Sequence, residues 1–225
     1  MRFISLSWTD NIPKDEVVLI VQTVYEALIQ ARQQWPKDGN IIAVPEIKPF
    51  GYWVLQDAPA EQRYGSMQWY IDNSFDQESH RLLARRYLQL VLAEPWQQQI
   101  PHYDLAVVHQ PLLDEVAQHS VFGVSVRGRA VVLSVHPLQT LDKGAQRYLS
   151  LRRLVAHYLG QMIGIPIPGW REETECLNQC AMRATNSLAE LIKYTEEESR
   201  ARVLYCRDCQ HELGARLASN HFGMN

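Results

Sequence analysis

The sequence predicts an α/β (α+β) protein in which a twisted mixed sheet is packed by helices and followed by a helical C-terminal part. Short runs of strand-forming residues alternate with helical patterns, a hairpin follows, and only helical patterns come after it. The 225 residues suffice for one domain, which would bury roughly 70–75% of the surface of the unfolded chain. We therefore expect a single domain, 1–225, with an α/β N-terminal subdomain (1–164) and a helical C-terminal subdomain (165–225).

The expected strands are short apolar runs. Residues 3–8 partly alternate, and the continuous apolar run 105–108 is typical of a central buried strand. The runs 121–126 and 130–135 flank Arg127-Gly128-Arg129, a sequence that predicts an antiparallel hairpin. Further strands are expected at 41–44, 52–55 and 66–71.

The expected helices show apolar residues every three or four positions. One covers 15–32, and Ser74 to Gln77 has the form of a capping box ahead of a helix through Leu92. The longest helix runs from about residue 142 to Gly164, where two nearby prolines prevent its continuation. The last two helices are expected at 184–200 and 210–218.

Composition excludes several classes of partner. The net charge of -3 gives no electrostatic basis for binding nucleic acid. No apolar run approaches the length of about 20 residues that crosses a bilayer, and the apolar start is too short for a signal peptide. We therefore expect a cytoplasmic protein that binds neither nucleic acid nor membrane, and the sequence indicates no oligomeric state.

The only four cysteines lie close together as two pairs, Cys176 with Cys180 and Cys206 with Cys209. Two thiolate pairs a few residues apart are the usual ligands of a structural zinc ion. In a reducing cytosol such clustering favours metal over disulfides. A redox-active CxxC is the alternative, although that motif is typical of a βαβ context, which the helical neighbours do not provide. The sequence thus predicts one four-cysteine Zn2+ site.

The helix ending at Gly164 and the cysteines after it together resemble the archaemetzincin family of zinc peptidases. That family couples the motif HExxHxxGxxH to a pair of cysteines, a methionine two positions on and a later CxxC. Here Cys180-Ala181-Met182 and Cys206-x-x-Cys209 match, as does the order of Tyr103-Asp104-Leu105, Ser120 to Gly123 and Ala130 to Ser134 upstream. The chain departs from the pattern at Cys176, which lies farther from the motif and closer to Cys180. The resemblance implies a metzincin-like fold with a Met-turn at Met182.

The motif itself is degenerate. His157 and Gly164 are present, but Tyr158 stands at the glutamate position, Gln161 at the second histidine and Ile167 at the third. Two histidines four residues apart hold zinc together with a third ligand, and the glutamate acts as general base. A phenol is already protonated near neutral pH, and isoleucine cannot bind metal. The resemblance therefore implies a peptidase fold without its catalytic zinc, a pseudopeptidase.

Two functional alternatives remain open at this point. An active metallopeptidase would need replacement ligands, for which His136, Glu172 and Glu173 are candidates. A thiol redox protein would use the CxxC at Cys206. In the pseudopeptidase interpretation, the family correspondence puts residues 121–126 at a sheet edge that pairs with an extended peptide, so a bound polypeptide is one candidate partner. The alternative is that a loop simply caps this edge.

Overall fold

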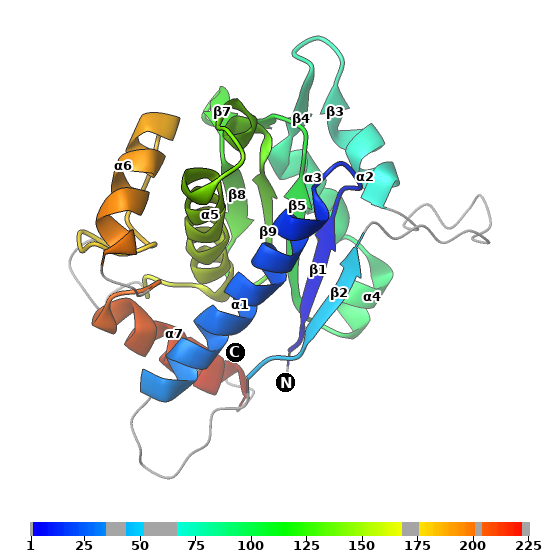
Figure 1. Ribbon diagram of the computed structural model, residues 1–225. Coiled ribbons are helices and arrows are strands. Elements are labelled where there is room, and N and C mark those ends of the chain that lie inside the picture. Colours follow the sequence, from blue (N-terminus) through cyan, green and yellow to red (C-terminus); the bar gives the residue numbers. More distant parts are fainter. Residues whose placement is uncertain (1, 35–43, 52–66, 168–175, 201–203, 222–225) are drawn as a thin grey trace.

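The computed structural model describes residues 2–34, 44–51, 67–167, 176–200 and 204–221 (Figure 1). Its main sheet has the strand order β2-β1-β5-β9-β8. The strands are β1 (Ile4–Trp8), β2 (Ile47–Gly51), β5 (Tyr103–Val108), β8 (Gly123–Val126) and β9 (Ala130–Ser134). The first four in this order run parallel, and β8 pairs antiparallel with β9. The predicted mixed sheet is confirmed.

Helices cover both faces of this sheet (Figure 1). One face packs against α1 (Lys14–Gln34) and α5 (Ala145–Ile163), and the other against α2 (Met67–Ser74) and α3 (Ala84–Leu92). Every residue of β5 is buried because both of its faces are covered. The C-terminal helices α6 (Leu188–Ser199) and α7 (Arg207–His221) pack on the α1/α5 side. Two short helices, α4 (Pro95–Gln99) and the 3-10 helix η1 (His136–Thr140), complete the set.

A second, smaller sheet lies beside the first and has the order β3-β4-β6-β7. Its strands are β3 (Phe75–Asp76), β4 (Arg81–Leu83), β6 (Leu112–Asp114) and β7 (His119–Val121). The predicted run 121–126 is therefore divided, since Val121 ends β7 and Gly123 begins β8. The predicted hairpin itself is confirmed, with Gly123 opposite Leu133 and Val126 opposite Ala130.

Two assignments in the region 66–92 were wrong. Residues 67–74 form helix α2 instead of a strand, and its buried residues Met67, Tyr70, Ile71 and Ser74 follow helical spacing. The helix expected directly after Ser74 begins only at Ala84. Asp76 instead accepts a hydrogen bond from the Ser79 amide in a turn, and His80 has the left-handed φ of 54°.

The remaining helix ends follow local capping. Gly164 takes a left-handed φ of 107° and ends α5, as predicted. Helix α6 begins at Leu188, later than expected, because the Ser187 hydroxyl accepts from the Glu190 amide and caps it. Residues 41–43 and 52–55, where strands were predicted, lie outside the described residues. Among the described helices, none is both long and apolar enough to span a membrane.

Candidate metal centre and degenerate cleft

The four cysteines come from two separate segments of the chain and lie close together in space. Cys176 and Cys180 lie in the segment after α5, Cys206 immediately precedes α7, and Cys209 lies in its first turn. The four sulfur atoms all lie within 4.8 Å of one another, and the Cys176 and Cys206 sulfurs are 3.7 Å apart. A tetrahedral zinc ion with bonds of about 2.3 Å places its sulfur ligands about 3.8 Å apart. The residues present therefore fit a zinc ion.

Amide groups surround these sulfurs. The Cys180 sulfur accepts hydrogen bonds from the amides of Met182 (3.5 Å) and Cys206 (3.2 Å), and Asn178 donates to the Cys206 sulfur at 3.5 Å. A hydrogen bond with Cys180 lowers the pKa of Cys176 to about 7, and the same contact raises that of Cys180. Such donors stabilise thiolates, the form that binds metal.

Hydrogen bonds join the two cysteine segments to each other and to helix α5. The Ala181 amide donates to the Leu204 carbonyl at 2.9 Å, which joins the two halves of the cluster. The buried Tyr205 hydroxyl donates to the Ala156 carbonyl of α5 at 2.6 Å. The cysteine cluster is thus connected directly to the helix turn that carries His157.

His157 lies in a linear series of hydrogen bonds that runs from the Ala181 carbonyl to the Ser125 hydroxyl. Its Nδ1 lies 2.8 Å from the Ala181 carbonyl, which can only accept, so Nδ1 carries the proton. Its Nε2 therefore has the lone pair and accepts from the Gln161 amide nitrogen at 2.8 Å. The Gln161 oxygen in turn accepts from the Ser125 hydroxyl at 2.9 Å. Burial lowers the pKa of His157 to about 4 and keeps the ring neutral.

A zinc-binding histidine usually donates Nδ1–H to a carbonyl while Nε2 holds the metal. His157 retains the first contact, through Ala181, and replaces the second with Gln161. Sequence reasoning placed Gln161 at the second ligand position but missed Ser125 and Ala181. The alternation of β8 was the available signal for Ser125, because it predicts which side chains of that strand face α5.

Tyr158, at the glutamate position, covers the sheet edge. Its hydroxyl donates to the Gly123 carbonyl at 3.1 Å, and burial raises its pKa, so the phenol stays neutral. A Cβ atom at Gly123 would lie 2.8 Å from the Tyr158 ring and 2.7 Å from the Val132 carbonyl. The close approach of the two residues depends on glycine at position 123.

The third ligand position is closed as well. Ile167 is buried in the core, and its amide donates to the Glu212 carboxylate of α7 at 2.6 Å. Of the proposed replacement ligands, His136 is exposed at the start of η1, and Glu172 and Glu173 lie outside the described residues. Within the described ranges, the cysteines form the only group of three or more metal-binding side chains that lie close enough to share an ion.

Met182 packs beneath α5. It is 2% exposed, and a Cβ atom at Gly160 would lie 2.4 Å from its sulfur. The methionine thus fills the space that Gly160 leaves on the helix, next to Cys180. This buried position agrees with the structural role expected of a Met-turn.

A cavity of about 400 Å³ remains next to His157. It is lined by residues 119–123 of β7 and β8, by Pro137, by His157, Tyr158 and Gln161 of α5, and by residues 184–188. Of the described residues that line it, none is Asp, Glu, Lys or Arg. The cleft therefore offers an uncharged surface.

These elements define a metzincin-like fold in which a four-cysteine cluster lies beside helix α5. Solved structures show the same overall fold. The archaemetzincin of Methanopyrus kandleri matches with a TM-score of 0.63 and 18% identity, covering 97% of this chain and 96% of that one. A zinc-dependent peptidase from Methanocorpusculum labreanum matches with a TM-score of 0.58 and 19% identity, over 93% and 99% of the two chains.

The archaemetzincin of Archaeoglobus fulgidus, complexed with malonate, matches with a TM-score of 0.55 and 16% identity, over 93% of this chain and 98% of that one. No protein-family model and no curated protein sequence matches the chain. The fold is archaemetzincin-like, as the cysteine and methionine pattern predicted.

Proposed function

We propose that this protein is a cytoplasmic pseudopeptidase that binds one structural zinc ion through Cys176, Cys180, Cys206 and Cys209 and catalyses no peptide hydrolysis. The observation that carries the proposal is the hydrogen bond from Gln161 to Nε2 of His157, which occupies the lone pair that a metal would need. Four free thiols with ligand geometry favour a reducing compartment.

The missing groups are those that perform the reaction. Loss of a general base costs about 10²–10⁴ in rate, and Tyr158 cannot replace it, because its phenol keeps its proton and donates it in a hydrogen bond to the Gly123 carbonyl. Without a metal there is also no Lewis acid to polarise a peptide carbonyl. A structural zinc on the cysteines would supply neither, because four thiolates leave no open coordination position.

We further propose that a polypeptide binds along strand β8. The Phe122 carbonyl accepts from the Ser134 amide at 2.8 Å, so residues 122 and 134 form a hydrogen-bonded pair. Such pairs alternate with non-bonded pairs, which turns the main-chain groups of Gly123 and Ser125 away from β9. Among the described strands, β8 is the edge of its sheet. An extended peptide could pair with Ser125 and place a side chain in the neighbouring uncharged cavity.

Metal analysis tests the first part. The purified protein should contain one zinc per chain, and Cys206→Ser should lose it while His157→Ala keeps it. Casein and a mixed peptide library should remain uncleaved after zinc is added. Two zinc ions per chain, or cleavage abolished by His157→Ala, would instead support an active metallopeptidase. Thiols that cycle with glutathione while zinc stays bound would favour a redox protein.

Selection from a displayed library of random ten-residue peptides tests the second part. Ser125→Pro removes the outward amide and should abolish binding of the selected peptides, whereas Ser125→Ala keeps that amide and should retain binding. Tyr158→Phe removes the hydroxyl that occupies the Gly123 carbonyl and should therefore increase the affinity for the selected peptides. Peptides that bind Ser125→Pro and the parent protein equally would refute the strand-addition mode.

A further inference from the structure

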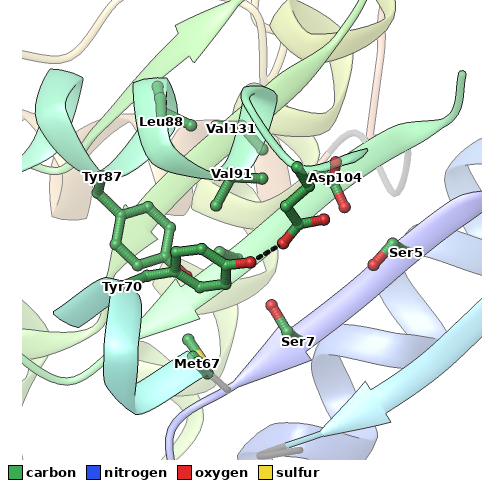
Figure 2. A pocket seen from close by; sticks show the side chains of 11 residues that line it. Ser5, Ser7, Met67, Tyr70, Tyr87, Leu88, Val91, Asp104 and Val131 are labelled. Carbon is green, nitrogen blue, oxygen red and sulfur yellow. Dashed lines mark hydrogen bonds between the residues drawn. The ribbon is translucent and has the colours of Figure 1, made fainter. Parts of the chain in front are cut away.

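A small polar cavity lies between the main sheet and helices α2 and α3, on the opposite face of the sheet from the cleft. Figure 2 shows side chains that line it. Its volume is about 20 Å³, room for one water-sized particle. Ser5 and Ser7 of β1 and Asp104 of β5 reach it from the sheet, while Tyr70 of α2 and Glu94 close it from the helical layer; further lining residues include Tyr87, Leu88 and Val91. The polar side chains that line it all present oxygen atoms.

Glu94 is the unusual member of this cavity. It is only 2% exposed, and its Oε1 atom accepts a hydrogen bond from the Tyr70 hydroxyl. Its Oε2 atom is buried and has no hydrogen-bond partner. A buried carboxyl oxygen that has no hydrogen-bond partner destabilises the fold, so the geometry calls for a ligand at this atom.

The surrounding charges also point to a cation. The titratable groups that face Glu94 are Tyr70 from α2, Tyr87 from α3, and His102 with Asp104 from the start of β5. Only His102 among them can be positive, and its Nε2 lies 3.3 Å from Asp104, which also accepts from Gln97. An ionised Glu94 would therefore lack a counter-charge of its own.

We propose that this cavity binds one hard cation of the size shared by Na+ and Ca2+, held by the Glu94 carboxylate and the hydroxyls of Ser5 and Ser7. Oxygen ligands suit such cations. The two carboxyl groups exclude an anion, and the volume excludes any larger ligand. Mg2+ is excluded because it demands near-ideal octahedral geometry and loses its water ligands reluctantly, whereas Ca2+ accepts an irregular set of oxygen ligands.

Thermal unfolding of the zinc-loaded protein tests the site. NaCl, CaCl2 and MgCl2 are compared with choline chloride at equal ionic strength and constant pH. Na+ or Ca2+ should raise the unfolding temperature with one-site saturation, and Mg2+ should match choline. Separate Na+ and Ca2+ titrations decide which of the two ions is preferred.

Two variants locate the effect. Glu94→Gln should weaken the response at least ten-fold, whereas Glu78→Gln, in an exposed turn, should retain it. Ser7→Ala should also weaken the response and serves if Glu94→Gln fails to fold. Equal unfolding temperatures in all salts, equal stabilisation by Mg2+ and Ca2+, or an undiminished response in Ser7→Ala and Glu94→Gln would overturn the proposal.

Discussion

The amide nitrogen of Gln161 lies 2.8 Å from Nε2 of His157, one helical turn away on the same face of α5. This contact satisfies the nitrogen that remains after Nδ1 donates to the Ala181 carbonyl. Gln161 thus supplies the donor that satisfies this nitrogen, at the position that the pattern HExxHxxGxxH gives to its second histidine. His157 and Gln161, which line the cleft, are therefore held in place by hydrogen bonds.

Removing this donor should destabilise the fold. Gln161→Ala leaves Nε2 of His157 and the Ser125 hydroxyl without their partner, and we expect a loss of about 1–2 kcal/mol in the free energy of unfolding. Urea denaturation measures it. Gln146→Ala on the same helix removes only an exposed contact with Glu196 and is the matched control. Equal stability of the two variants would contradict the role assigned to Gln161.

The neutral His157 ring should make stability depend on pH. The folded protein protonates it only near pH 4, whereas the unfolded chain does so near 6.5. The unfolded state therefore binds more protons between these values, and stability falls as the pH is lowered from 6.5 towards 4. The contribution lost is at most about 3 kcal/mol.

Comparison of the parent protein with His157→Gln isolates the contribution of His157 to the pH dependence of stability. Protonation of the cysteines affects both proteins and does not change the difference between them. The parent protein should show the steeper loss of stability between pH 6.5 and 4 in urea titrations. His119→Gln, which removes an exposed histidine, should behave like the parent protein. Parallel curves for the parent and His157→Gln would show that the ring is not held neutral.

The elements that local sequence defines were predictable. Gly164 ends α5 because a left-handed residue is required there, and the turn at Gly128, with a φ of 74°, closes the β8–β9 hairpin. The region 74–92 was not predictable, because the polar residues after Ser74 serve equally well as a capping box or as the turn that Asp76 forms with Ser79. Tertiary pairing of β4 with β6 decides between them.

The site shows the same division. The cysteine spacing indicated a metal centre because four thiols close together have few other uses in a reducing compartment. The hydrogen-bond partners around His157 could not be predicted from the sequence. Ala181 contributes only its carbonyl, and Ser125, which bonds to Gln161, lies 36 residues from it in the chain. Main-chain acceptors leave no trace in residue type, so only the folded structure identifies them.

Gly123 should tolerate no side chain. In Gly123→Ala the new Cβ would lie 2.7 Å from the Val132 carbonyl and 2.8 Å from the Tyr158 ring, and strand backbone cannot move away easily. We expect a loss of about 1–3 kcal/mol in the free energy of unfolding. Gly144→Ala, with no heavy atom within 4 Å of the added carbon, is the control. A Gly123→Ala variant as stable as Gly144→Ala would refute this close packing.

Removal of zinc should loosen the C-terminal part before the sheet. The amide of Ala181 is bonded to the Leu204 carbonyl across the two cysteine pairs, whereas the amide of Val135 is bonded to Val108 in the main sheet. A structural zinc stabilises the segments that hold it by several kcal/mol, given binding energies of about 10–16 kcal/mol in small zinc modules. After chelation, hydrogen exchange at Ala181 should accelerate far more than at Val135.

Asn178→Ala removes one donor to the Cys206 sulfur but no ligand, so it should retain zinc and slow exchange at Ala181. Unchanged exchange at Ala181 after complete zinc removal would show that the cysteine cluster does not stabilise the fold.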